Sequence, residues 1–303
     1  MEMSKSQNVR RLALMRRSML FIPGNNPSMI QNAPVLGADS IILDLEDAVS
    51  IDEKDSARYL VRNALLEIDF SGCERVVRIN SIGTNFGYDD IDVIARVKPD
   101  ALIIPKATEE GVEEVDELLS AIEREEGFKL GSIKIIPLIE TAIGLEDVFN
   151  IVKSSKRVVA VLLGAEDLTA DMEIKRTKEG EEIFYARSKV VSVCKALKVD
   201  AIDTPFTDVN DFEGLRKDSE KAKLIGMTGK AAINPRQIDI INEVFSPSKD
   251  DINWAKRVIS AYEEAQREGK GVFSLDGKMV DAPILQRAKN IIEKAKAIGL
   301  IKG

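Results

Sequence analysis

The chain has 303 residues, of which 44% are hydrophobic and 31% are charged, a composition typical of a globular protein. Its net charge of −8 argues against a nucleic-acid partner, which would require a basic surface. No apolar run approaches the roughly 20 residues that cross a bilayer, so we expect no membrane segment. Cys73 and Cys194 lie in unrelated segments and suggest no disulfide framework, which favours a reducing cytoplasm.

Histidine is absent from the sequence. This excludes nucleophile systems that depend on histidine, and it excludes zinc sites built on imidazole. With two scattered cysteines, any metal would be held by oxygen ligands, which favours Mg²⁺, Mn²⁺ or Ca²⁺. Any general acid or base would be a carboxylate, lysine, tyrosine or cysteine.

Eight short apolar runs follow one another along the chain. They cover residues 18–24, 39–46, 75–80, 101–106, 134–140, 158–167, 200–206 and 229–234. Most are continuously apolar, as parallel strands buried on both faces are, and helical patterns such as 108–127 and 181–197 separate most of them. Eight such alternations predict an α/β fold, the (β/α)8 TIM barrel. An open doubly wound sheet is the alternative, but no GxGxxG motif follows the first strand.

A helical extension is predicted after the barrel. We assign residues 1–240 to a barrel that carries the active site and residues 241–303 to the extension. An amphipathic pattern predicts a helix over 248–269 with Ser248 as its N-cap. A glycine-containing turn over 269–283 then leads to a last helix at 284–298.

Charged side chains end most of the apolar runs. In a TIM barrel these ends meet at one mouth, where active sites lie. Each charge alone is explained by capping or an ion pair, but several carboxylates buried together require a cation. The runs end in Asp44, Glu46 and Asp47, in Arg78, in Lys106, in Glu140, and in Glu166 and Asp167. Since Glu140 and Asp167 end neighbouring strands about 4.8 Å apart, they predict a Mg²⁺ site.

Longer motifs point to a family. RRSMLFIPGNNPSMI, ADSIILDLEDAV, IIPLIETAIGL and LLGAEDLTADM resemble the citrate lyase β-subunit group of the HpcH/HpaI aldolases and CoA-thioester lyases. The resemblance runs from Arg16 to the C-terminal helices. It implies a barrel that uses Mg²⁺ and assembles as a homotrimer or a multiple of three. It also implies a cytoplasmic lyase that cleaves a citryl thioester, on acyl-carrier protein or on CoA, to oxaloacetate and the acetyl thioester, with citrate lyase α and γ subunits as partners.

The same resemblance assigns roles to individual residues. Glu140 and Asp167 match the Mg²⁺ ligands, and Glu140 thereby contacts the substrate. Arg78 matches the arginine that binds the carboxylate and carbonyl of the oxo-acid. Arg17 and Lys54 match basic residues near the thioester carrier and its phosphates.

The chemistry of the cleavage also requires an acid and a base. Asp44, Glu46 and Asp47 match the acidic motif that closes the second strand. Glu46 or Asp47 either takes the hydroxyl proton or orients Arg78 and the metal's waters. Asp281 matches a family aspartate on the extension, and we expect it to protonate the thioester enolate. It can act in trans because the extension of relatives can fold over a neighbouring barrel.

Other functions stay open at this stage. CoA lyases of the malyl type usually carry Ile-His-Pro after the eighth strand, whereas Ile233-Asn234-Pro235 here fits the citrate lyase branch better. A malyl-CoA or other 3-hydroxyacyl-CoA lyase is the near alternative, followed by an aldolase that uses no CoA. A non-catalytic scaffold subunit is the third, although every charged motif position that we can match is filled.

Overall fold

The computed structural model describes residues 15–70, 72–267, 273–275 and 278–301. The segment 1–14, which the sequence predicts to be a tail before the first strand, lies outside the described residues. The chain forms two compact units, one of them Arg16–Phe245 and the other running on from Ser246.

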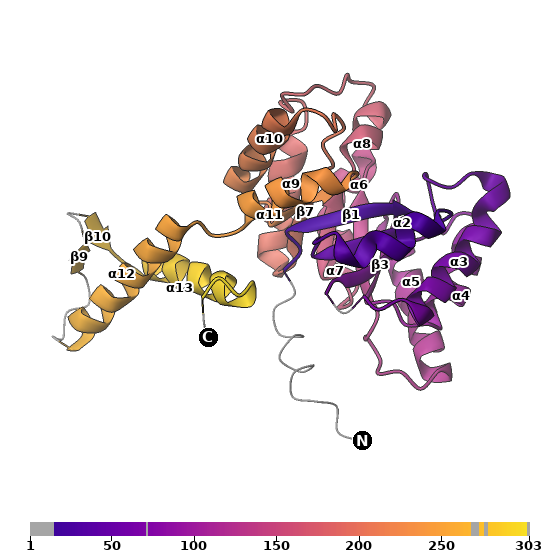
Figure 1. Cartoon of the computed structure of the whole chain (residues 1–303), viewed down its shortest axis with the longest axis horizontal. Helices are drawn as coiled ribbons and strands as arrows, with labels where there is room; N and C mark the ends of the chain where they lie inside the picture. The colour runs from indigo at the N-terminus through magenta and orange to yellow at the C-terminus, as the bar shows by residue number, and fades with distance from the viewer. Residues whose placement is uncertain (1–14, 71, 268–272, 276–277, 302–303) are drawn as a thin grey trace. The chain divides into compact units, whose positions relative to one another are not determined.

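The first unit is a closed barrel of eight parallel strands (Figure 1). The strands pair in chain order, and the last pairs with the first. The predicted TIM barrel is therefore confirmed. The strands are β1 (Ser18–Pro23), β2 (Ser40–Asp44), β3 (Glu74–Arg78), β4 (Ala101–Ile104), β5 (Lys134–Ile139), β6 (Ala160–Leu163), β7 (Asp200–Asp203) and β8 (Gly229–Ala232).

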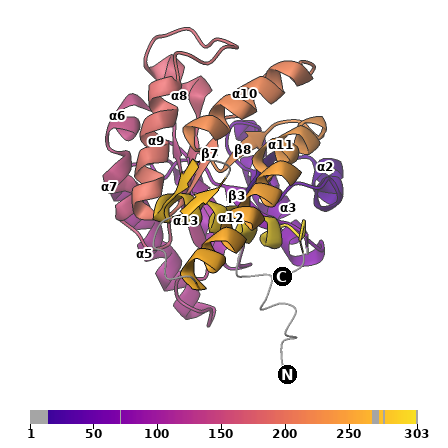
Figure 2. The same cartoon turned by 90° about the vertical axis from the view of Figure 1, so that its left-hand side faces the viewer.

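Helices surround the strands of this unit, as Figure 2 shows. They are α2 (Pro27–Asn32), α3 (Lys54–Glu67), α4 (Asn85–Ala95), α5 (Glu109–Glu125), α6 (Ala142–Glu146), α7 (Val148–Lys153), α8 (Ala165–Asp171), α9 (Phe184–Leu197), α10 (Phe212–Ile225) and α11 (Ile238–Phe245). Short 3₁₀ turns are η1 (Ala33–Val35), η2 (Ile51–Glu53) and η3 (Pro235–Gln237). In the described part of the chain, no helix combines the length and apolar character that crossing a membrane requires.

Both faces of the strands are buried. Met19 and Ile42 belong to the cluster that fills the barrel, and Leu20 and Ile41 belong to the cluster shared with the helices. Successive strand residues point to opposite faces, so burial of both faces requires apolar residues at every position. This explains why the strands appear in the sequence as continuous apolar runs.

The sixth strand is shorter than its predicted range of 158–167. β6 ends at Leu163, and α8 begins at Ala165 immediately after Gly164. Ala165, Leu168 and Thr169 are buried at helical spacing, which the apolar run before them conceals in the sequence. Asp167 therefore lies in the first turn of a helix, and the prediction that it ends the strand is wrong.

The second unit contains α12 (Lys249–Arg267), a hairpin of β9 (Phe273–Leu275) and β10 (Lys278–Val280), and α13 (Ala282–Ala297). Ser248 accepts the backbone N–H of Asp251, as its predicted N-cap role requires. A small apolar core joins the pieces: Ala255, Val258, Val280 and Ala288. The hairpin was not predicted, because strands of three residues leave too short an alternation to detect.

Candidate active site

A cavity of about 420 Å³ opens at the carboxyl ends of the strands. Its charged lining residues come from four different strand–loop junctions, and apolar side chains complete the wall. Those charged residues are Asp44, Asp47, Arg78, Glu140, Glu166 and Asp167. The structure thus brings together side chains that lie more than a hundred residues apart in the sequence.

Arg78 is the most highly connected of these residues. Its Nε and Nη2 atoms donate to the two carboxylate oxygens of Asp44, at 2.7 and 2.6 Å. Nη1 lies 3.0 Å from Glu46 Oε2 and 3.2 Å from Asp47 Oδ2. The guanidinium also lies over the ring of Phe21, 5.0 Å from its centre. Strand register explains the first pair, since Asp44 and Arg78 are direct partners on β2 and β3.

Glu46 has an unusual environment for a carboxylate. Oε2 is buried and, although close to Arg78, it has no hydrogen-bond partner within the described residues. Burial raises the pKa of Glu46 to about 7; Arg78 opposes the shift, and the charges of Asp47 and Asp44 add to it. Such a group exchanges its proton near neutral pH, as a general base or acid must.

Glu140 directly follows β5 and is 3% exposed. Its Oε1 atom accepts the backbone N–H of Lys106 at 2.7 Å. Lys106 adopts a left-handed backbone conformation with φ of 47°, which directs that N–H inward. The pKa of Glu140 is raised to about 8, chiefly by burial and also by the charges of Glu46 and Asp167, while the N–H of Lys106 opposes the shift.

A glycine allows Glu140 to fit beside α8. A Cβ atom on Gly164 would lie 2.7 Å from Cβ of Glu140 and 2.9 Å from its Oε2, closer than side chains tolerate. Asp167 follows three residues later, is exposed, and lines the same cavity. Glu140 and Asp167 thus face the cavity from adjacent junctions.

These carboxylates fit a hard divalent cation. Within the described residues, no three carboxylates or cysteines form a closed metal cage. Mg²⁺ usually takes only one or two protein carboxylates and fills its other positions with water and substrate oxygens. Burial, and after it the charges of Glu46 and Asp167, raise the pKa of Glu140, and a bound divalent cation would favour the charged carboxylate against both.

The position of Lys54 differs from its predicted role. Its side chain is buried, and Nζ donates to the backbone carbonyls of Leu45 and Glu46 at 2.9 and 2.6 Å. Lys54 therefore fixes the loop that carries the acidic motif. A direct contact with carrier phosphates disagrees with this geometry, because the ammonium is already coordinated inside the fold.

Arg17 lies at the wrong end of the barrel for its predicted role. It precedes β1 and pairs with Asp39, which precedes β2, at 2.7 Å. Both residues stand at the amino ends of the strands, opposite the mouth where the substrate would bind. The structure thus separates Arg17 from the other predicted site residues.

Asp281 belongs to the second unit, where it is the N-cap of α13. Its Oδ1 atom accepts the backbone N–H of Ile284 at 3.2 Å. This contact accounts for an aspartate before Ala-Pro at a helix start. Its role in catalysis stays a prediction.

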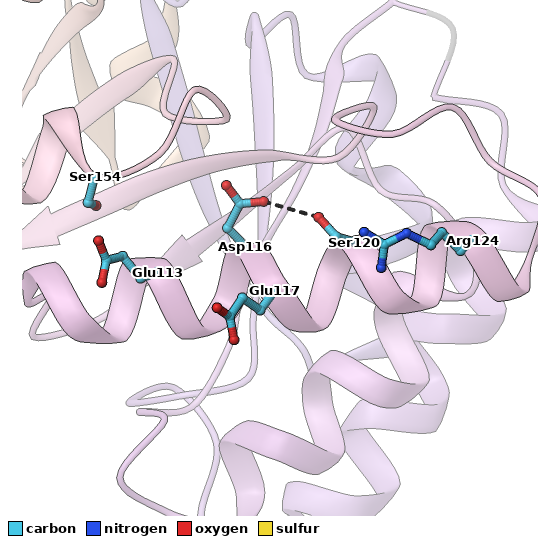
Figure 3. A pocket seen from close by; sticks show the side chains of 6 residues that line it. All are labelled: Glu113, Asp116, Glu117, Ser120, Arg124 and Ser154. Atoms are coloured by element: carbon cyan, nitrogen blue, oxygen red, sulfur yellow. Dashed lines mark hydrogen bonds between the residues drawn. The ribbon is translucent and has the colours of Figure 1, made fainter.

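A second hollow, of about 450 Å³, lies along the outer side of α5 and contains several polar groups: Glu113, Asp116, Glu117, Ser120, Arg124 and Ser154 (Figure 3). Asp116 accepts hydrogen bonds from Ser120 and Ser155 and pairs with Arg157. These contacts tie α5 to the segment before β6. We therefore place the active site in the cavity at the strand ends.

The sequence matches the family model described as HpcH/HpaI aldolase/citrate lyase over residues 17–235. The chain belongs to this family. Among HpcH/HpaI relatives, the citrate lyase subunit beta of Leuconostoc mesenteroides subsp. cremoris is 42% identical over 288 residues, which cover 95% of each chain.

Two solved structures of relatives are similar to this family member. CitE from Mycobacterium tuberculosis, in complex with magnesium, acetoacetate and coenzyme A, is 29% identical with a TM-score of 0.77, and the match covers 94% of this chain and 99% of that one. The citrate lyase beta subunit of M. tuberculosis, complexed with oxaloacetate and magnesium, is 28% identical with a TM-score of 0.66. That match covers 79% of this chain and 100% of the other.

Thr204 holds part of the HpcH/HpaI site in place, a role that the sequence does not assign to it. Thr204 is fully buried, and its Oγ1 atom accepts the backbone N–H of Ala165 at 3.1 Å. The polar pair Asp203-Thr204 after an apolar strand was visible in the sequence, but nothing there distinguishes a residue that binds backbone from one that binds substrate.

The raised carboxyl pKa values predict how stability depends on pH in the metal-free protein. Glu140 has an ordinary pKa of 4.5 and a folded-state pKa of about 8, so the folded state holds the proton more tightly than the unfolded one. The stability it contributes is fully present below pH about 4.5 and is lost as the pH rises through about 8. The melting temperature should therefore fall between pH 6 and pH 9, and Glu140→Gln should flatten that fall. A Glu140→Gln protein with the wild-type slope would contradict the assignment.

Proposed function

We propose that this chain is a Mg²⁺-dependent carbon–carbon lyase that cleaves a citryl thioester to oxaloacetate and the acetyl thioester, as a citrate lyase β subunit does. The observation that carries the proposal is the cavity in which Arg78 and the acidic motif face Glu140 and Asp167. Near full-length identity of 42% to a citrate lyase subunit beta supports the substrate class. The oxaloacetate and magnesium held by a relative of the same fold support the product and the metal.

The reaction requires a defined movement of electrons. The tertiary hydroxyl loses its proton, its oxygen becomes the carbonyl of oxaloacetate, and the bond to the thioester's α-carbon breaks. The electron pair of that bond forms the thioester enolate, which takes up a proton to give the acetyl thioester. When bound, Mg²⁺ would lower the hydroxyl pKa and polarise the developing carbonyl. Glu140 and Asp167 are the residues that would hold it.

Arg78 and Glu46 fit two further steps. Arg78 lines the cavity and keeps its charge at every relevant pH, so it can bind the carboxylate of the oxo-acid while Asp44 fixes its orientation. Glu46 has a raised pKa, and no described residue makes a hydrogen bond to its Oε2 atom, so it is better suited than exposed Asp47 to accept the hydroxyl proton. Asp47 then helps to orient Arg78.

The remaining assignments complete the proposal. The extension of one subunit covers the barrel of a neighbour in a homotrimer or a multiple of three, where Asp281 protonates the enolate. The thioester is carried on CoA or on an acyl-carrier protein, and CoA in the complex of a relative supports the first. The enzyme acts in the cytoplasm, with citrate lyase α and γ subunits as partners where the acyl carrier is a protein.

The test is cleavage of citryl-CoA by the isolated full chain, followed as oxaloacetate release with Mg²⁺ and with a chelator. We expect release that requires Mg²⁺ and that is lost in Glu140→Ala and in Asp167→Ala, because each variant removes one oxygen ligand. The same assay on malyl-CoA separates the near alternative.

Each other outcome selects a different function. Cleavage of malyl-CoA with none of citryl-CoA would make the chain a 3-hydroxyacyl-CoA lyase of the neighbouring branch. Inertness toward all thioesters, free or on a carrier protein, would leave the aldolase that uses no CoA and the non-catalytic subunit. Release that continues in the chelator would contradict the role of the metal.

A further inference from the structure

The helix that carries Asp167 is short and is fixed by contacts beyond its own backbone. α8 has seven residues, Ala165–Asp171, too few to be stable through helical hydrogen bonds alone. Its first N–H donates to Thr204, and its side chains at Ala165, Leu168 and Thr169 are buried. The direction of its exposed face, which carries Asp167, depends on what holds its other end.

Asp171, the last residue of α8, makes that contact. Its Oδ2 atom accepts the backbone N–H of Ala142 at 2.7 Å. Ala142 is the first residue of α6 and comes two residues after Glu140. The proposed reaction does not use Asp171.

Two hydrogen bonds join the segment that follows β5 to the segment that follows β6, and they flank Glu140 and Asp167. On one side, the N–H of Gly164 donates to the carbonyl of Ile139 at 2.9 Å. On the other side, Asp171 accepts from Ala142. Glu140 lies between the linked positions on one chain segment, and Asp167 lies between them on the other. Asp171 follows Asp167 by four positions, one turn of the helix, so both stand on one face of α8.

We infer that Asp171 is a positioning residue that sets the separation of Glu140 and Asp167 for the divalent cation, through its hydrogen bond to Ala142 and without contacting the metal. This inference rests on the proposed Mg²⁺ site. Hydrogen bonds from residues outside the ligand set commonly hold ligands in register, and their loss typically lowers metal affinity 10- to 100-fold.

The two partners of this hydrogen bond can be removed separately. Asp171→Ala removes the acceptor, and Asp171→Asn removes the charge but keeps an oxygen that can accept. Ala142→Pro removes the donor and leaves Asp171 unchanged. Proline is well tolerated at the first position of a helix, and Thr141 before it is already extended, with φ of −131° and ψ of 152°. Asp147→Ala is the matched control, since it removes a carboxylate that follows α6 directly and whose side chain, among the described residues, accepts a hydrogen bond only from Asn150.

The measurement is Mn²⁺ binding to the full-length protein, followed by the electron paramagnetic resonance signal of free Mn²⁺. We expect Asp171→Ala and Ala142→Pro each to raise the dissociation constant about tenfold, and the double variant to raise it no further. Asp171→Asn and Asp147→Ala should stay within about twofold of the wild type. At saturating Mg²⁺ the kcat of Asp171→Ala should recover, which separates a loss of metal affinity from general damage.

Several results would overturn the inference. One is wild-type Mn²⁺ affinity in Asp171→Ala. Another is equal weakening by Asp171→Asn, because charge and not the hydrogen bond would then matter. If Asp171→Ala fails to fold, wild-type affinity in Ala142→Pro overturns it equally. A wild type that binds no Mn²⁺ would remove the metal site and this inference together, whereas one that binds Mn²⁺ but cleaves no thioester would fail the proposed function alone.

Discussion

Replacing Arg78 by lysine is expected to lower kcat/KM for thioester cleavage by about 10²- to 10³-fold. Arg78 uses three nitrogens at once: Nε and Nη2 on Asp44, and Nη1 beside Glu46 and Asp47. A lysine ammonium keeps the positive charge, but it is a single nitrogen on a flexible stem. It cannot hold the paired geometry on Asp44 and still present a planar donor to the oxo-acid.

The same variant should change the pH dependence of the reaction. The charge of Arg78 lowers the pKa of Glu46, whose value of about 7 results from burial. A lysine nitrogen drawn toward Asp44 would oppose that burial less, so the acid limb of the kcat/KM profile should move to higher pH. Steady-state kinetics between pH 6 and pH 9 measure both effects.

Arg96→Lys provides the matched control. Arg96 also pairs with three carboxylates, Asp92, Glu125 and Glu126, but it lies on the surface. Surface pairs contribute about 0–1 kcal/mol, so Arg96→Lys should leave kcat/KM and its pH profile unchanged. Equal activities of the two lysine variants would show that Arg78 serves the fold and not the reaction.

The barrel could be predicted from the sequence because its physical signal is repeated eight times. Each strand is buried on both faces, so each appears as a short apolar run between helical patterns. The prediction was wrong where an element's signal merged with its neighbour's. The run that includes β6 continues smoothly into the buried face of α8, and only Gly164 marks the boundary.

Part of the site could also be predicted, because the barrel fixes where the strands end. Parallel strands place their carboxyl ends at one mouth, so Arg78, Glu140 and the acidic motif had to converge. The predicted roles that disagree with the structure belong to charged residues whose partners are backbone atoms or lie at the other end of the barrel. Lys54 binds two carbonyls, and Arg17 pairs at the opposite end of the barrel. A sequence shows that a residue is charged, but it does not show which group that residue contacts in the folded protein.

A substitution in the buried group of charges carried by β7, β8, α9 and α10 is expected to have the largest effect on the stability of the barrel. Lys230 is fully buried, and its Nζ atom lies 2.5 Å from Asp203 and 2.6 Å from Asp218. Arg187 completes the group with 2.8 and 2.7 Å contacts to the same two carboxylates. Two cations thus balance two anions in a region that water does not reach.

Lys230→Met should lower the free energy of unfolding of the barrel by about 3–5 kcal/mol, because it leaves one buried carboxylate charge without compensation. Urea unfolding followed by circular dichroism measures this. Lys217→Met, which removes an exposed lysine 3.2 Å from Glu213, should change it by less than about 0.5 kcal/mol. A Lys230→Met protein as stable as Lys217→Met would contradict the prediction.

A second substitution separates loss of charge balance from loss of packing. Lys230→Met with Asp218→Asn returns the group to one cation and one anion, and the asparagine oxygen can still accept from Arg187. If imbalance causes the loss, the double variant should be more stable than Lys230→Met alone. Replacing a whole buried ion group by apolar residues is often neutral or stabilising, so the expected loss comes from breaking the group and not from its presence in the fold. Because Thr204 directly follows Asp203 and holds the start of α8, the same break should also weaken divalent-cation binding at Asp167.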